Sequence, residues 1–199
     1  AHPDCGVAMS FLTGTNVELI YASTGVSAAK ASWTTEVTCN DTATMGVQAH
    51  LPPDFFLPSP GQIGRGIRIV ARGILSSTGT PTYTFTIRAG AAGAINTAIL
   101  LGTAALTTGS GVTNQIWEMQ GDVVLTTIGA AGTNSTVRGV GTFISPGTAN
   151  KIDPAYGGGA SPGTVATLDT TITNYINFNI ACSASSASNT VTIQKLLVF

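Results

Sequence analysis

The chain has 199 residues, of which 9% are charged, and eight Lys and Arg against nine Asp and Glu give a formal net charge of −1. The usual charged fraction is about 25%, so this chain has unusually few charges. Basic residues are also not in excess, so nothing would neutralise a phosphate backbone, and we expect no nucleic acid among the partners. The hydrophobic content of 43% suits one domain with a core and excludes a disordered polyelectrolyte. No apolar run approaches the roughly 18–20 residues that span a bilayer, so we expect no membrane partner either.

The N-terminal part of the chain differs from the rest. Residues 50–60 hold four of the nine prolines. Since proline fixes φ and cannot donate to a strand ladder, this stretch should be extended and non-repetitive. Phe55 and Phe56 within it must be buried, either against the chain's own sandwich or against a neighbouring subunit.

Two segments in the middle of the chain have the period-two alternation of half-buried strands. Residues 82–88 place three large apolar side chains on one side and threonines on the other. Residues 66–75 alternate less cleanly, and the turn-forming residues 76–81 lie between the two segments. The pattern predicts an antiparallel hairpin.

Similar segments continue to the C-terminus. The longest, residues 115–127, contains Gly121, which suggests a bulge or bend, and the Gly- and Pro-rich residues 146–162 predict a long loop. No segment has helical spacing, and β-branched residues dominate. About eight strands predict an all-β fold, an antiparallel β-sandwich of jelly-roll type over residues 61–199, with an extended N-terminal arm over residues 1–60.

The cysteines and histidines form no metal-binding pattern. Cys5, Cys39 and Cys182 include no CxxC pair and match no zinc spacing. His2 and His50 are far apart in irregular sequence. We expect buried or unreactive thiols, with a Cys5–Cys39 disulfide as the alternative, and neither a metal nor a cofactor.

The acidic residues are scattered singly. Glu118 and Asp122 share a strand face about 13 Å apart, beyond the roughly 5–9.5 Å between glycosidase carboxyl groups, unless another strand supplies a partner. The glycines at residues 157–159 lack the Lys-Ser/Thr and the helix of a phosphate-binding loop. A catalyst needs titratable groups that converge in a pocket, so we expect no catalytic residues and no enzymatic activity.

Six residues are candidates for an interface. Arg68 and Arg72 would project from one strand face. An acid of an adjacent strand, Glu118 or Asp122, or a group on another subunit, could pair with each of them. Tyr156 is an aromatic candidate for contact with a carbohydrate. Trp33 is expected either in the core or at an interface. The candidate interface residues are Phe55, Phe56, Arg68, Arg72, Trp33 and Tyr156.

Several short runs carry a resemblance to a known family. These runs are residues 51–56, 65–69, 71–85, 116–118, 169–171 and 183–192. Together they resemble the jelly-roll structural proteins of tailed bacteriophage virions. The resemblance covers roughly residues 51–199 and marks the fold rather than any contact residue.

The resemblance implies a virion protein, most often a trimeric decoration (cement) or head-fibre protein on the capsid surface. Such a protein binds the major capsid protein through its arm and the base of its sandwich, and it assembles in the host cytoplasm. A homotrimer is also physically reasonable, because a closed oligomer covers sheet edges that would otherwise template aggregation. The alternative is a minor tail or head-fibre protein whose jelly roll binds a host glycan or receptor.

Overall fold

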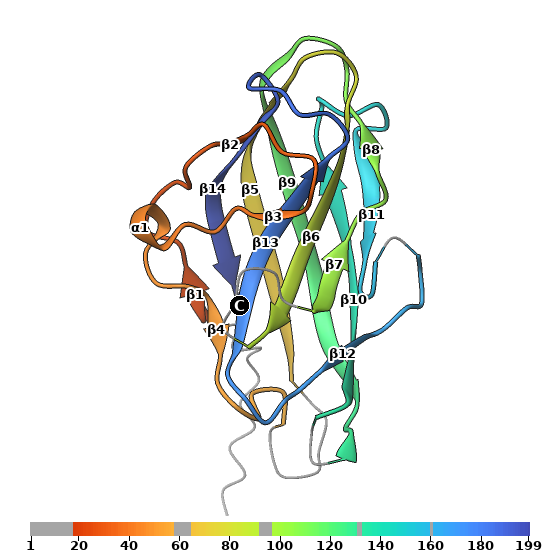
Figure 1. Ribbon diagram of the computed structural model, residues 1–199. Helices are drawn as coiled ribbons and strands as arrows, with labels where there is room; N and C mark the ends of the chain where they lie inside the picture. Colours follow the sequence, from red (N-terminus) through yellow and green to blue (C-terminus); the bar gives the residue numbers. More distant parts are fainter. Residues whose placement is uncertain (1–17, 58–64, 92–96, 131–132, 160) are drawn as a thin grey trace, which may run out of the picture.

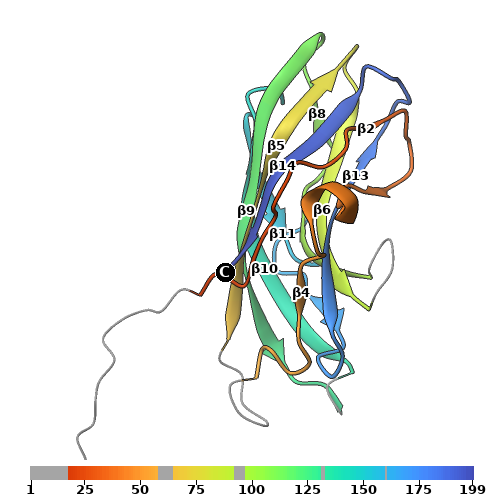
Figure 2. The ribbon, with the colours of Figure 1, turned by 90° about the vertical axis from the view of Figure 1, so that its left-hand side faces the viewer.

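The computed structural model describes residues 18–57, 65–91, 97–130, 133–159 and 161–199. Within them the chain folds into two packed layers of strands (Figures 1 and 2). Every pairing between these strands is antiparallel. The fold class predicted from the sequence, an all-β antiparallel sandwich of jelly-roll type, is therefore confirmed.

Eight strands make up the two layers. They are β5 (Gly66–Ser77), β6 (Thr82–Gly90), β7 (Ala98–Gly102), β9 (Val112–Thr127), β10 (Ser135–Ile144), β11 (Ile152–Tyr156), β13 (Asn174–Cys182) and β14 (Thr190–Val198). One layer has the order β14-β5-β9-β10 and the other β11-β7-β6-β13, and the pairing of β10 with β11 joins them on one side. The pairs β5–β14, β6–β13, β7–β11 and β9–β10 are nested along the chain, as in a jelly roll.

β5 and β6 do not form the hairpin that the sequence predicted. β5 lies between β14 and β9, whereas β6 lies in the other layer between β13 and β7. The connection crosses the end of the sandwich, where the Thr78 N–H donates to the Asn189 side-chain oxygen (2.9 Å). The prediction was wrong because alternation reports which side of a strand is buried, not which strand is its neighbour.

Residues 18–57 cover the open side of the sandwich between the edge strands β14 and β13. Their elements are β1 (Tyr21–Ala22), β2 (Lys30–Ala31), β3 (Val37–Thr38), the one-turn helix α1 (Thr42–Met45) and β4 (His50–Leu51). β1 and β2 pair with β14, whereas β3 and β4 pair with β13. The expected extended arm is thus, over residues 18–57, a cover packed along both edges. Residues 1–17 lie outside the described residues.

The sequence predicted no helix, and α1 is too short to leave a periodic pattern. It begins where the Asp41 carboxylate accepts the Ala43 N–H (3.0 Å), which satisfies a helix N-terminal donor. Its last residue, Met45, is buried in the core. The turn therefore fastens the covering segment to the sandwich.

The core between the layers is a cluster of stacked aromatic rings. Phe85 and Phe143 have ring centroids 4.4 Å apart, and Trp117 and Phe178 are 4.8 Å apart. These rings come from four strands of both layers, so the cluster joins the layers directly. Aromatic pairs at such distances contribute beyond the area they bury.

Glycines on the inner side of β9 and β10 let the layers approach closely. A Cβ atom on Gly139 would lie 1.8 Å from the Leu100 carbonyl oxygen, and one on Gly121 would lie 2.8 Å from a methyl group of Leu101. Gly121 does not form the expected bulge, because strand pairing continues regularly on both of its sides. Because Gly121 has no side chain, β7 can pack closely against β9 at this position.

The Gly- and Pro-rich stretch expected as a long loop contains β11. This strand holds Asp153 and Pro154, residue types that are depleted in strands, so no strand pattern is visible in its sequence. Two short strands, β8 (Leu106–Thr107) and β12 (Ala166–Leu168), complete the structure by pairing with β6 and β10.

Candidate functional site: an exposed sheet face and an end pocket

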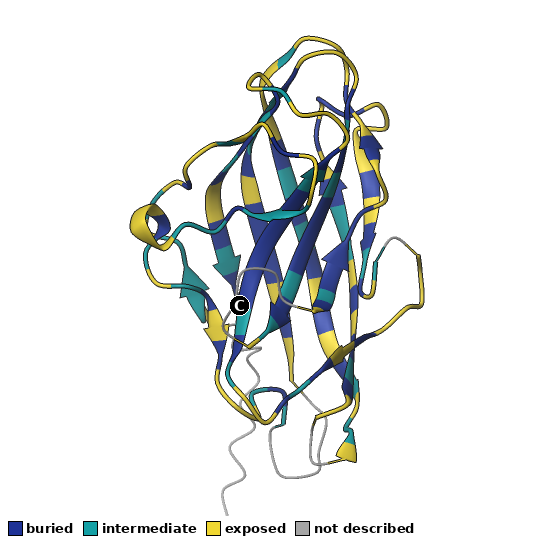
Figure 3. Ribbon diagram, in the orientation of Figure 1, coloured by how far each residue is buried: buried dark blue, intermediate teal, exposed yellow. Residues whose placement is uncertain are grey.

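The outer face is the side of the β14-β5-β9-β10 layer that points away from the core, together with the same side of β11, which pairs with β10 along its whole length. Alternate residues along β5, β9 and β10 are exposed there (Figure 3). Ile116 is 68% exposed and Val140 56% exposed. Single exposed apolar residues are normal, but several on one face indicate an interaction site. The exposed aliphatic side chains of this face are Ile116, Val124, Val140, Ile144 and Ile152.

The corresponding side of the other layer is covered by the N-terminal segment. Glu36 forms an ion pair with Arg88 of β6, and the Thr38 hydroxyl donates to the Asn179 side-chain oxygen of β13 (2.7 Å). Asn179 consequently has no exposed surface, although it points away from the core. Of the two sheet faces, the outer face is therefore the one that the described N-terminal residues leave exposed.

Two ion pairs cross the middle of the outer face. Arg68 of β5 lies opposite Asp122 of β9, with Nε 2.7 Å from Oδ1 and Nη2 2.9 Å from Oδ2. Arg72 lies opposite Glu118 and donates to it through Nε. These are the pairs that the sequence predicted on an adjacent strand, and the prediction is confirmed. The hydrogen bond from Arg68 lowers the pKa of the Asp122 carboxyl, and the charge of Arg68 adds to this.

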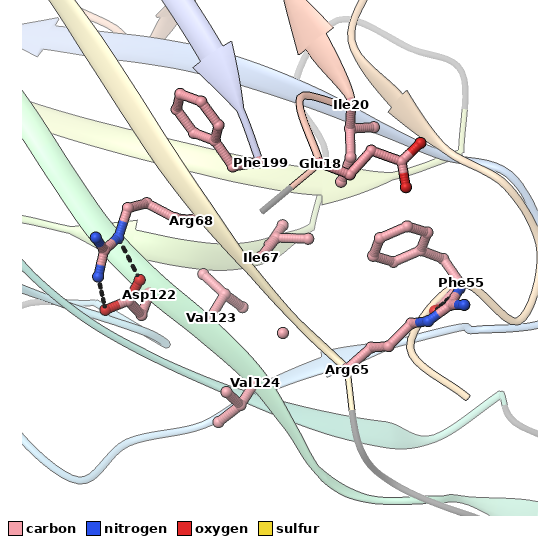
Figure 4. Close-up of a pocket in the computed structure, with 11 residues that line it drawn as sticks. Glu18, Ile20, Phe55, Arg65, Ile67, Arg68, Asp122, Val123, Val124 and Phe199 are labelled. Carbon is pink, nitrogen blue, oxygen red and sulfur yellow. Dashed lines mark hydrogen bonds and ion pairs between the residues drawn. The ribbon is translucent and has the colours of Figure 1, made fainter. Parts of the chain in front are cut away.

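A pocket of about 730 Å³, here called the end pocket, lies where β5 begins (Figure 4). Its walls include the apolar side chains of Ile67, Val123 and Phe199. Phe199 is held beside β5 by paired backbone hydrogen bonds with Arg68 (2.9 and 3.0 Å). The end pocket thus opens at the base of the sandwich, next to the C-terminus.

Charged groups flank the apolar part of the end pocket. The Arg68–Asp122 pair lies on one side (Figure 4). On the other side, the Arg65 guanidinium carbon is 5.6 Å from the centroid of the Phe55 ring, a cation–π contact. Since Arg68 and Asp122 belong to both features, the end pocket continues into the outer face.

The structure brings four of the six sequence candidates to this surface. Arg68, Arg72 and Tyr156 lie on the outer face, where Tyr156 pairs across the strands with Val140, and Phe55 lines the end pocket. Phe56 and Trp33 do not belong to it, because they are 2% and 7% exposed in the core. Phe56 and Trp33 are therefore core residues and not interface residues. Large aromatic side chains occur both in cores and at interfaces, and the sequence does not distinguish the two locations.

The aliphatic residues of the outer face were missed by sequence reasoning. Val140 and Ile144 are two of the outward positions of β10, a period-two signal that was readable in the sequence. Ile152 lies on β11, which the sequence did not identify as a strand. The signal for the first two was present, but the sequence could not tell which side of β10 faced the core.

Other chemistry is limited in the described part of the chain. No three His, Cys, Asp or Glu side chains among the described residues lie close enough together to hold a metal ion. Cys39 and Cys182 are buried free thiols, and burial raises the pKa of Cys39. Cys5 and His2 lie outside the described residues. No described helix has both the length and the apolar character needed to cross a membrane.

Comparison with known proteins gives little further information. No family model and no curated protein matches the chain. Among solved structures, a similar one is the crystal structure of the marine PL-14 alginate lyase from Aplysia kurodai, with 8% sequence identity and a TM-score of 0.36. The match covers 92% of this chain and 99% of the other. This similarity is too low to carry an argument about function.

Proposed function

We propose that this protein is a non-enzymatic structural protein of a tailed-bacteriophage virion that decorates the outer surface of the capsid. The sequence resemblance suggests the kind of particle. The end pocket carries the proposal, because it combines apolar side chains with the exposed cation Arg65 at one end of the sandwich. Burial of such a surface is favourable, by about 25 cal/mol per Å² of apolar area.

The end pocket is the part that would contact the major capsid protein. Glu18, the first residue that the structure describes, lines it, so the described N-terminal segment begins at the base of the sandwich. Val124, which is 46% exposed, suits an apolar side chain of the shell, and Arg65 suits a neighbouring carboxylate or carbonyl. Many copies on one shell would strengthen a modest affinity through multivalency.

Binding to capsids that lack this protein tests the proposal. The purified full-length chain is incubated with such capsids, from the phage whose genome encodes it, and the sedimented fraction is measured. We expect saturable binding that Phe55→Ala or Arg65→Glu weakens about tenfold or more, a loss of about 1.4 kcal/mol. Absence of the protein from purified virions, or no binding to these capsids, would refute the proposal.

Lys151→Glu is the matched control. It is also a charge reversal at an exposed position, but it lies in the connection between β10 and β11, at the opposite end of the sandwich. Its binding should equal that of the unmodified chain. Equal weakening by Lys151→Glu and Arg65→Glu would mean that net charge, not the end pocket, governs attachment.

A second candidate function is binding of a host carbohydrate. A shallow groove of about 210 Å³ on the outer face is lined by Gln120, Asp122 and Thr142 among others, and Tyr156 lies on the neighbouring strand. Amide, carboxylate and hydroxyl groups offer the donors and acceptors that a sugar requires. A glycan array with the full-length chain and with Gln120→Ala tests this function. No bound glycan, or equal binding by both, would exclude the groove.

A further inference from the structure

We infer that the outer face is a homodimer interface, on which a second copy of this chain packs face to face about a two-fold axis that runs parallel to the strands between β5 and β9. The inference concerns the isolated chain and does not depend on the assignment to a virion. It rests on the arrangement of charges, on the apolar residues around them and on the area available.

The ion-paired charges of the outer face are sorted into two columns. Both cations of the ion pairs, Arg68 and Arg72, are on β5, and both anions, Asp122 and Glu118, are on β9. The strand register places each cation directly opposite its anion. A positive column therefore lies beside a negative column, about 4.8 Å away.

This arrangement is self-complementary. Rotation by 180° about the proposed axis exchanges β5 and β9 between the two copies and leaves the position along the strands unchanged. Each Arg72 then faces Glu118 of the second copy, and each Arg68 faces Asp122 of the second copy. Because these four charges are already paired within their own chain, covering them leaves none of the four both buried and unpaired. Lys195 on β14 and Arg138 on β10 also lie on this face and are exposed, and their long side chains keep the charged ends in water at the rim.

The aliphatic residues match under the same rotation. Ile74 and Ile116 are direct partners on β5 and β9, so Ile74 of one copy faces Ile116 of the other. Ile116, which is 68% exposed in the single chain, would thereby be covered. The rotation also places β10, with Val140 and Ile144, over β14 of the second copy, where Leu197 points outward.

The available area is sufficient for a weak to moderate dimer. Four strands about 4.8 Å apart, and about ten residues that rise about 3.3 Å each, give a rectangle of roughly 600 Å² on each copy. Two copies would bury roughly 1,200 Å², the lower limit of stable protein interfaces. Aligned packing of two twisted sheets at about −30° is a common arrangement.

The charge columns favour a two-fold pair over the trimer that the sequence resemblance implies. A two-fold contact joins the same surface of both copies, whereas a three-fold contact joins two different surfaces. The outer face is complementary to itself, and this property favours a two-fold contact, in which the same surface of each copy meets. A mass measurement separates the two arrangements.

The first experiment is sedimentation equilibrium of the full-length chain from about 1 to about 200 µM, a range that brackets a modest dissociation constant. We expect a species of twice the 20.1 kDa chain mass. Ile116→Glu should raise the dissociation constant at least about tenfold, since it buries an unpaired charge. The control is Val47→Glu, a substitution at a residue that is 77% exposed on the covering segment, and it should leave the constant unchanged.

The second experiment uses charge reversal within the Arg72–Glu118 row. Arg72→Glu alone leaves two acids in the row and Glu118→Arg alone leaves two arginines, so each variant should be monomeric. An equimolar mixture should form a heterodimer, because the acids of one chain then face the arginines of the other. The double variant should dimerise with itself again, as each column keeps an opposite partner.

These results distinguish the interface from an effect on folding, since complementation requires that each single variant is folded. A monomer at every concentration, a three-copy species, or a mixture that fails to associate would each overturn the inference. Because no capsid is present in either experiment, failure here leaves the proposed decoration function intact. Failure of capsid binding likewise leaves the dimer intact.

Discussion

The Arg88 guanidinium and the Glu36 carboxylate form a two-point ion pair, with Nε 2.8 Å from Oε1 and Nη2 2.8 Å from Oε2. Arg88 lies on β6 and Glu36 lies just before β3, so the pair joins the covering segment to the sandwich. The Thr86 hydroxyl donates to the same carboxylate. Side chains of the pair are only 16% and 24% exposed, which makes this the most sheltered of the ion pairs in the described residues.

Glu36→Gln should lower the free energy of unfolding by about 1–2 kcal/mol at pH 7, because it removes charged hydrogen bonds from a sheltered site. Urea unfolding followed by circular dichroism measures this change. The exposed acid Glu18 offers the control, and Glu18→Gln should change the free energy by less than about 0.5 kcal/mol. A loss no larger than that of the control would contradict a stabilising role for the pair.

The loss from Glu36→Gln should also depend on pH. Burial raises the pKa of Glu36, but the hydrogen bonds from Arg88 and Thr86 and the charge of Arg88 outweigh this and lower the pKa below its ordinary value of 4.5. The contribution is thus complete above about pH 4.5, the unfolded value, and is lost as the pH falls through the lower folded value. The difference between the two proteins should therefore shrink between pH 5 and pH 2, and a difference that stays constant over that range would count against this account.

Gly139→Ala should destabilise the sandwich by about 3 kcal/mol or more, since its Cβ would lie 1.8 Å from the Leu100 carbonyl oxygen and the backbone of β7 must move. The control is Gly109→Ala, whose Cβ would meet only a Val112 methyl group at 3.5 Å. It should change the free energy of unfolding by less than about 1 kcal/mol. Thermal and urea unfolding measure the free energies of unfolding of the two variants. Equal stability would mean that the backbone of β7 moves away from the new methyl group without strain.

The sequence predicted the long strands of the fold because their alternation reflects one buried side. Residues 82–88 and 115–127 were expected as strands and lie within β6 and β9. It could not predict the cover over residues 18–57, because strands of two residues leave no period and their partners are over a hundred residues away. The neighbours of β5 and β6 were unpredictable for the same reason, because each of these strands pairs with strands that are distant in the sequence.

The candidate surface was predictable only in part, for a related reason. Arg68 and Arg72 share a period with Asp122 and Glu118, so strand spacing alone suggested that they would pair. Phe56 has no such pattern, and its burial depends on where a proline-rich segment turns back onto the core. The apolar character of a side chain predicts that it will be buried, but it does not predict whether its own chain or a partner buries it.

The buried thiols should be unreactive in the native protein. Burial raises the pKa of Cys39, and its side chain is fully covered. The Cys182 thiol is also buried and donates to the Ala184 carbonyl oxygen (3.2 Å). Because the thiolate is the reactive form, iodoacetamide at pH 8 should leave both cysteines unlabelled until denaturant is added, as peptide mass spectrometry can show. Rapid labelling of Cys39 in the native protein would mean that the covering segment opens readily.

Asp122 should titrate below its ordinary pKa of 3.8, because the hydrogen bond from Arg68 favours its charged form and outweighs the opposite effect of desolvation. The side-chain carboxyl carbon shift, followed by NMR in dilute protein, gives the midpoint. Arg68→Gln should raise the midpoint toward 3.8, since a neutral amide stabilises a carboxylate less than a guanidinium does. Arg72→Gln is the matched control, as Arg72 pairs with Glu118 one row away, and it should leave the Asp122 midpoint nearly unchanged. An equal response to both substitutions would mean that the column of cations on β5 acts on Asp122 through its overall field, and not through the direct pair.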